Sequence, residues 1–155
     1  MKKIISLRIL LFSSILLLNS KATFAQFNSK GPFGGSVSCS IAVDTSVYVG
    51  TLNGGVFQST TSQLLAWRPL VVGLKSGKIT ALTYSGLDLF AATADSGIYV
   101  YNGYVGTNRY WVKINNGLNN LKIKSLLALD STTILAGTDG GGSAQPLAHP
   151  ACSGK

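Results

Sequence analysis

The sequence predicts an all-β protein, and three observations support this fold class. Apolar residues recur at every second position in short runs, which is typical of strands with one buried face. Glycine, asparagine, aspartate and serine separate these runs, and these residues favour tight turns. After the first 25 residues, no stretch shows a sustained helical period. We therefore expect short antiparallel strands joined by hairpins.

A pattern of about 43 residues occurs nearly three times along the chain. The copies begin near Val37, Ile79 and Ile123, and the third is lost after Gly142. The expected strands are 36–43, 47–51, 55–59 and 67–71 in the first copy, 78–84, 87–93, 97–101 and 110–114 in the second, and 122–129 and 133–138 in the third.

Units of four strands and this length are typical of propeller blades. The sequence therefore predicts a partial β-propeller of about two and a half four-stranded antiparallel blades. The expected organisation is a signal peptide at 1–25, a leader at 26–35, blade 1 at 36–74, blade 2 at 75–118, an incomplete blade 3 at 119–142 and a non-repeat tail at 143–155.

Within each blade, recurring residues have expected roles. The first strand, with Val37 and Ile79 at equivalent positions, should fill the contact between blades. Gly50 ends a second strand, where a glycine permits close approach of the backbone. Trp67 and Trp111 recur at the repeat spacing, so we expect both indoles to open the outer strand and cover the outer core.

The N-terminus has the three parts of a secretory signal peptide. Lys2 and Lys3 precede an apolar run over 9–18, and small residues lead to Ala25. The apolar run is shorter than the ~20 residues that a spanning helix needs. We expect cleavage after Ala25, no stable membrane span, and export to the periplasm, the cell surface or the medium.

Two cysteines and the net charge add little about partners. An exported chain could pair Cys39 with Cys152, but Cys39 alternates with Ile41 and Val43, which favours a small buried role. The net charge is +8, with 13 Lys and Arg against 5 Asp and Glu. Because the basic residues are scattered rather than gathered on one stripe, we expect no nucleic-acid partner.

The repeat resembles those of bacterial BNR/Asp-box propellers, a group that includes sialidases, sortilin-type receptor domains and photosystem II assembly factors. The resemblance lies in a small apolar strand, Gly-Thr, Gly-Gly-Val-Phe, a Trp and Asn-Asn-Gly-Leu, and it covers about residues 34–142. The family's box is Ser-x-Asp-x-Gly-x-x-Trp. Here Ser59 is in place, Thr61 occupies the position of the Asp, and no Gly precedes Trp67. The match is to the repeat more than to the box.

The ionisable residues argue against catalysis. The chain has no Glu, and its carboxylates are Asp44, Asp88, Asp95, Asp130 and Asp139. Three of them recur at the first hairpin of each copy, which favours turn formation over the carboxylate pair of a glycosidase. The single histidine, His149, cannot complete a metal site or a triad. The glycines over 137–142 favour a turn over a phosphate cradle. We expect no enzyme, no metal and no cofactor.

A cluster of aromatic residues is the candidate ligand surface. Tyr101, Tyr104, Tyr110 and Trp111 lie at the edge of the second repeat and would suit a sugar or a peptide. The alternative is ordinary cross-strand packing.

The expected function is a non-catalytic secreted module, or a fragment of one, that binds a protein or a glycan. The alternatives are a fragment of a propeller glycoside hydrolase of sialidase or xyloglucanase type, and a fragment of the periplasmic sensor of a two-component regulator. Two and a half blades cannot close a ring. We therefore expect a truncated or frame-shifted piece of a longer propeller that self-associates through exposed blade edges, or else a short chain that completes its ring with copies of itself.

Overall fold

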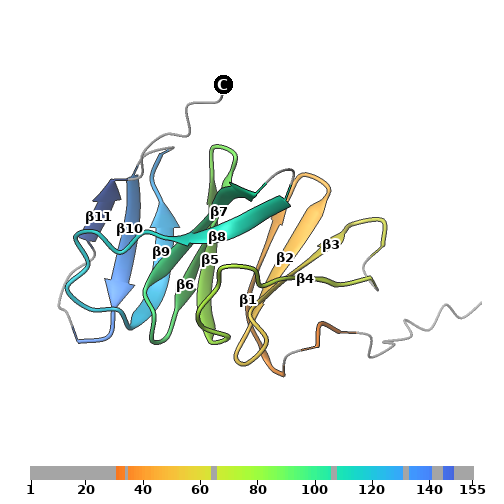
Figure 1. Ribbon diagram of the computed structural model, residues 1–155, viewed down its shortest axis with the longest axis horizontal. Coiled ribbons are helices and arrows are strands. Elements are labelled where there is room, and N and C mark those ends of the chain that lie inside the picture. Colours follow the sequence, from red (N-terminus) through yellow and green to blue (C-terminus); the bar gives the residue numbers. More distant parts are fainter. Residues whose placement is uncertain are drawn as a thin grey trace, which may run out of the picture.

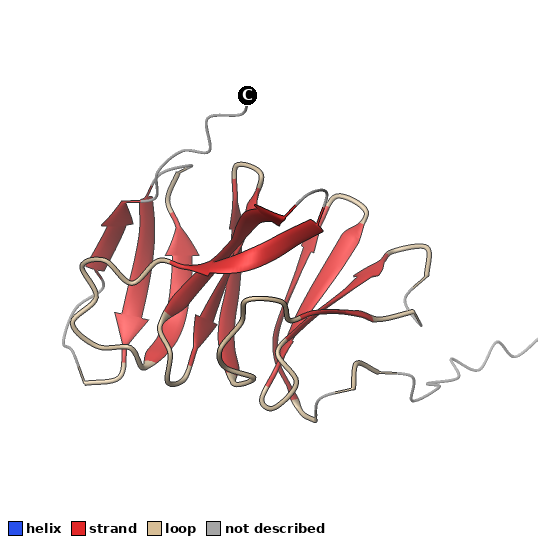
Figure 2. Cartoon of the chain, viewed as in Figure 1, coloured by secondary structure: helices blue, strands red, loops and turns tan. Residues whose placement is uncertain are grey.

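The computed structural model describes residues 31–33, 35–63, 66–105, 108–130, 133–140 and 145–148, with strand pairing alone for 103–105 and 145–148. Over these residues the chain forms eleven strands and no helix (Figure 2). Every strand pair is antiparallel. The all-β prediction is therefore confirmed. It follows that the described part of the chain contains no helix able to cross a membrane.

The strands form three sheets that lie side by side along the long axis of the molecule (Figure 1). The first sheet contains β1 Val37–Val43, β2 Ser46–Thr51, β3 Val56–Thr60 and β4 Arg68–Leu70. The second contains β5 Ile79–Ser85, β6 Asp88–Thr93, β7 Ile98–Val105 and β8 Asn108–Lys113. The third contains β9 Ile123–Ala128, β10 Thr133–Thr138 and β11 Gln145–Ala148. Each sheet is a simple meander in chain order.

The third sheet corrects one expectation. The sequence predicts two strands there and a tail outside the repeat at 143–155, but β11 pairs with β10 through Gln145 to Ala148. Pro146 hides this strand from a search for strand patterns, because proline lacks an N–H. Proline is nevertheless tolerated at a sheet edge, and β11 is the edge strand of its sheet.

Two apolar cores lie between the three sheets. One joins the first and second sheets and includes Val56, Ile79 and Trp111, and the other joins the second and third and includes Phe90 and Ile123. The first strands are neighbours across both junctions, since β1 contacts β5 and β5 contacts β9. Successive residues along a strand of the second sheet therefore pack in turn against the first sheet and the third sheet. Because both of its faces are covered, every residue of β6 is buried.

A bulge recurs in the first strand of each sheet. Ser38, Thr80 and Lys124 are each the extra residue that shifts the register against the second strand. A bulge bends and twists its strand. In the first sheet it also makes a contact across the junction, because the Ser38 hydroxyl donates to the Ile79 carbonyl oxygen at 2.6 Å.

Position in the stack decides the burial of equivalent residues. Ile79 and Ile123 are fully buried, whereas Val37 at the matching place in β1 is 55% exposed. The expectation that Val37 fills a contact between blades is therefore wrong. Ile79 packs toward the first sheet and Ile123 toward the second, but no described sheet precedes β1.

A threonine organises the turn after the second strand in the first sheet and in the second sheet. The Thr51 hydroxyl donates to the Gly55 carbonyl and accepts from the Gly54 N–H, and Thr93 does the same with Gly97 and Ser96. Gly55 and Gly97 have positive φ, which glycine adopts at little cost. Each of these two turns therefore ends on a glycine in the left-handed conformation.

Gly50 lies at the junction of the first two sheets, as the repeat predicts. A β-carbon added there would lie 2.5 Å from Ile79 Cγ2 and 2.6 Å from Cys39 Sγ. Cys39 is a half-buried free thiol that packs on the core between these sheets, and burial raises the pKa of this thiol. Cys152 lies outside the described residues.

Candidate binding cleft between the first two sheets

The aromatic residues selected from the sequence separate into two groups. Tyr101 on β7 and Tyr110 on β8 line a cleft. Trp111 does not belong to a ligand surface, because it is 2% exposed and its indole N–H donates to the Leu70 carbonyl oxygen at 2.7 Å. The side chain of Tyr104 lies outside the described part of the structure. The packing alternative therefore holds for Trp111, which contacts the Tyr101 ring with centroids 5.0 Å apart.

The two tryptophans of the repeat have different surroundings. Trp111 lies within β8 and bonds to the first sheet, while Trp67 precedes β4 and is half-buried. Neither residue opens its strand as expected, whereas the expected place in an apolar core is confirmed for Trp111, which belongs to the core between the first two sheets. The contact that Trp111 makes is with a preceding sheet, and no described sheet precedes the one that carries Trp67.

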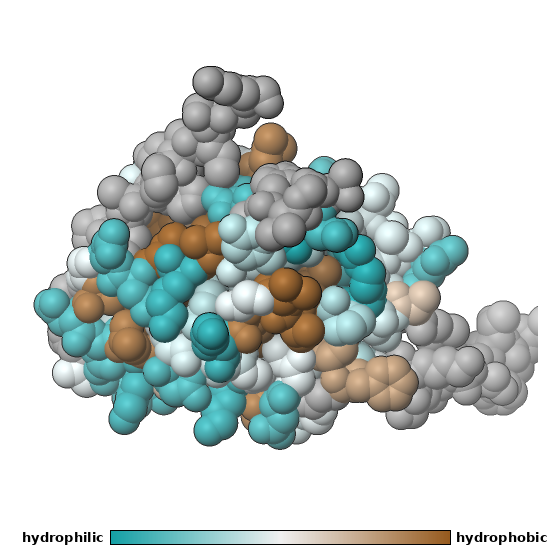
Figure 3. All heavy atoms as spheres, in the orientation of Figure 1, coloured by the Kyte–Doolittle hydropathy of each residue, from teal (hydrophilic) through white to brown (hydrophobic). Residues whose placement is uncertain are grey.

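The cleft opens between the outer strands of the first and second sheets and has a volume of 660 Å³. Its walls combine tyrosine rings, arginines and side-chain amides from both sheets. The lining residues are Tyr48, Gln58, Arg68, Pro69, Leu70, Val72, Tyr101, Asn108, Arg109 and Tyr110. On the face shown in Figure 3, apolar areas are separated by polar ones, and this mixture is also found in the cleft lining.

The wall on the first sheet comes from one row across three strands. Tyr48 on β2 lies opposite Gln58 on β3, and Gln58 lies opposite Arg68 on β4. Side chains opposite each other in an antiparallel pair share a face. Gln58 joins the row: its amide oxygen accepts from Arg68 Nη2 at 2.8 Å, and its amide nitrogen donates to Ser46 Oγ at 3.2 Å and to Tyr48 Oη at 3.4 Å.

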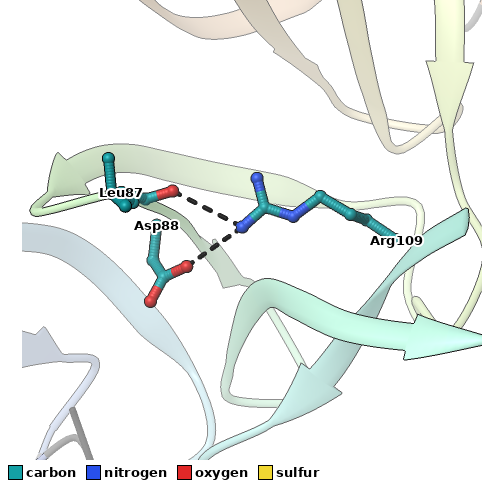
Figure 4. Close-up of polar contacts among 3 residues, drawn as sticks. All are labelled: Leu87, Asp88 and Arg109. Carbon is teal, nitrogen blue, oxygen red and sulfur yellow. Dashed lines mark hydrogen bonds and ion pairs between the residues drawn. The ribbon is translucent and has the colours of Figure 1, made fainter. Parts of the chain in front are cut away.

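The wall on the second sheet contains an ion pair. Arg109 Nη2 lies 3.1 Å from Asp88 Oδ1 and also donates to the Leu87 carbonyl oxygen (Figure 4). The guanidinium lies 5.5 Å from the centre of the Tyr101 ring, within the range of a cation–π contact. Asp88 opens β6 and is nearly buried. Asp88 thus forms the ion pair with Arg109 in addition to its place beside the turn between β5 and β6, where it lies opposite Ser85.

Other carboxylates fit the turn interpretation better. Asp44 has a positive φ in the turn between β1 and β2. Asp130 accepts from the Thr133 N–H at 2.8 Å in the next equivalent hairpin. A hydrogen bond from Ser76, joined by one from Ser96, lowers the pKa of Asp95. These carboxylates therefore stabilise local structure.

A tyrosine beside the cleft stays protonated. Burial, followed by the proximity of Tyr48, raises the pKa of Tyr84, although Arg109 acts in the opposite direction. The neutral hydroxyl adds no negative charge close to Arg109.

The residues considered from the sequence as metal ligands or as a phosphate cradle form no site in the described part of the molecule. No group of three His, Cys, Asp or Glu residues there could hold a metal ion. Gly140 has a positive φ after β10, in keeping with a turn. Gly141, Gly142 and His149 lie outside the described residues.

Sequence reasoning missed Tyr48, Gln58 and Arg68. Their signal is a regular spacing, since each lies 10 residues from the next and each hydrogen bond between them spans that distance. Residues at this spacing lie opposite one another only if each hairpin turn falls midway between them. The row therefore depends on the exact positions of the turns, which the structure gives.

Comparisons with known proteins find a likeness among solved structures and none among families or curated sequences. No known protein family has a sequence profile that matches the chain, and no similar sequence is found among curated proteins. Among solved structures, the chain resembles the crystal structure of the computationally designed Ika4 protein, with a TM-score of 0.55 and 20% identity, over 74% of this chain and 67% of that one. At this identity the likeness concerns the fold alone.

Proposed function

We propose that this chain is an exported, non-catalytic module of β-propeller type that binds a glycan or a protein in the cleft between its first two sheets. The observation that carries the binding proposal is the cleft itself, where three tyrosines and two arginines line one opening of 660 Å³. Ligand sites are commonly concave, with aromatic walls and a few placed polar groups.

The propeller assignment is supported by the serial stacking of the sheets. Four-stranded meanders follow one another, and β1, β5 and β9 are neighbours, as in blades arranged around an axis. The resemblance of the repeat to BNR/Asp-box propellers points the same way. Export is supported by the three-part pattern of residues 1–25.

The absence of catalysis is supported by the composition of the cleft. Among the residues that the structure describes, its lining includes no Asp or Glu, and the nearby Asp88 is bound to Arg109. Glycoside hydrolysis normally uses a pair of carboxylates across the scissile bond. A cleft of this composition favours holding a ligand over cleaving it.

The test is a pair of aromatic substitutions in the full chain. Tyr110→Ala removes a ring from the cleft, whereas Phe33→Ala removes an 89% exposed ring that does not line it. On a panel of glycans and peptides, we expect Tyr110→Ala to weaken binding about tenfold, a typical loss for an aromatic contact residue, and Phe33→Ala to leave it unchanged. The proposal fails if no ligand binds, or if both variants bind as the wild type does.

A further inference from the structure

We propose that the cleft binds a glycan whose sugar rings carry carboxylate groups, with Arg68 as the residue that binds the carboxylate and Gln58 as the residue that positions Arg68. This inference rests on the proposed function, because it assigns a ligand class to the same cleft.

The charges of the cleft favour an anionic ligand. Its lining includes Arg68 and Arg109 and no carboxylate. Arg109 is compensated by Asp88 at 3.1 Å, but the partner of Arg68 is the neutral amide of Gln58. No ion pair within the described ranges involves Arg68. One positive charge therefore lies in the cleft without a compensating carboxylate.

The attachment of Arg68 suits recognition of a carboxylate. Its hydrogen bond to Gln58 uses one N–H of the five that a guanidinium carries. The planar guanidinium can bind both oxygens of a carboxylate through two parallel N–H groups. Gln58 is itself fixed by bonds to Ser46 and Tyr48. An exposed side chain is thus anchored in the cleft, and less freedom is lost when the ligand binds.

The remaining lining favours a sugar over an acidic peptide. Tyrosine rings have an apolar face and a polar hydroxyl, which match the C–H face and the hydroxyl rim of a sugar, and Asn108 adds an amide. A peptide that binds by adding a strand needs a free sheet edge. Two edge strands, β4 and β8, line the cleft. β4 has three residues, and Pro69 among them has no N–H to donate, while β8 already donates its Trp111 N–H to the Val72 carbonyl oxygen.

The experiment measures binding of defined oligosaccharides to the purified full chain by titration calorimetry. The probes are an oligogalacturonate, the same oligosaccharide as its methyl ester, a sulfated carrageenan oligosaccharide that has no carboxylate, and a poly-glutamate peptide. The variants are Arg68→Gln, Arg68→Lys, Gln58→Ala and the matched control Lys122→Gln, whose side chain is exposed and outside the cleft. Thermal melts verify that each variant folds.

We expect oligogalacturonate to bind at least about tenfold more tightly than its methyl ester, because a charge-assisted bidentate contact is lost on esterification. Arg68→Gln should remove that difference. Arg68→Lys should keep part of it, because lysine supplies the charge without the fork. Gln58→Ala should weaken binding of the acid form more than that of the ester. Lys122→Gln should change neither.

The outcomes separate the two proposals. Equal binding of acid and ester, both weakened by Tyr110→Ala, would overturn the carboxylate assignment and leave the binding cleft standing. Tighter binding of the carboxylate-free sulfated oligosaccharide or of poly-glutamate would overturn the ligand class in the same way. Binding of every probe without any effect of Tyr110→Ala or Arg68→Gln would overturn both. If Arg68→Gln fails to fold, Arg68→Lys takes its place. The ratio of its affinities for the acid and the ester then decides the question.

Discussion

Single residues at the junctions between sheets are constrained by what the neighbouring sheet brings close. Gly50 and Asp88 illustrate two kinds of constraint, because one is limited by space and the other by charge. Both belong to a second strand, β2 or β6, which lies in the interior of its sheet. Their substitutions therefore have effects that depend on tertiary structure more than on strand propensity.

Gly50→Ala should destabilise the protein by about 1–3 kcal/mol, the usual cost of overpacking. The new β-carbon would lie 2.5 Å from Ile79 Cγ2, so β2 and β5 would have to separate. Urea unfolding followed by fluorescence measures the change. Gly31→Ala is the matched control, since a β-carbon added at Gly31 would have nothing within 4 Å. Equal stability of the two variants would contradict the close approach.

Asp88→Asn should cost about 1–3 kcal/mol, because the Arg109 guanidinium loses a carboxylate partner at a nearly buried position. The control is Asp139→Asn. Its pair with Lys124 spans 3.4 Å between side chains that are 53% and 64% exposed, and exposed pairs contribute about 0–1 kcal/mol. Chemical denaturation of both variants tests this order, and a larger loss for Asp139→Asn would refute it.

At the scale of elements, the junction between the first and second sheets is built from polar bonds as well as an apolar core. The linker after β4 takes part, because the Val72 carbonyl accepts from the Trp111 N–H at 2.9 Å. Gly73 in the same linker has a positive φ and lies directly against the Trp111 backbone. Strand β8 is thereby held to the first sheet, and this contact forms one end of the cleft.

Trp111→Phe should weaken this junction. It removes the bond from the indole N–H to the Leu70 carbonyl oxygen, leaves that buried acceptor without its donor and costs about 1–3 kcal/mol. Trp67→Phe is the matched control, because Trp67 is only half-buried. Thermal unfolding should show a clearly larger decrease in Tm for Trp111→Phe, and the reverse order would contradict the assigned role.

At the scale of the whole molecule, the third sheet buries one face only. Ile134 and Ala136 face the core, whereas Leu127 on the other side is 56% exposed and lies opposite Leu135. Among the described residues, no further sheet covers this side. Exposed apolar surface of this kind promotes association, which bears on the self-association expected from the sequence.

Leu127→Lys should therefore reduce self-association of the purified chain. We expect sedimentation velocity to show association that increases with concentration for the wild type and decreases in this variant, because a charge is placed on the uncovered face. Leu87→Lys serves as the control, since Leu87 is 81% exposed in the turn between β5 and β6. A wild-type monomer at every concentration would disprove the prediction.

The amino-acid sequence by itself determined the strands and their repetition. Alternation of apolar residues and the turn residues near Asp44 and Gly97 act over a few neighbours, so ten strands could be predicted from the pattern. The edge strand β11 escaped because Pro146 carries no strand signal of its own. Its pairing depends on β10, which lies beside it in space.

The cleft follows from contacts between sheets. In the sequence, Arg68 and Arg109 resemble scattered surface charges, and Trp111 fits both a ligand surface and an outer core. Cross-strand register places Arg68 beside Gln58, and the packing of the first sheet on the second brings Arg109 to the same opening and buries Trp111. Local patterns specify which face of a strand is apolar, but the contacts between sheets join residues far apart in the chain and are set by the fit of whole surfaces.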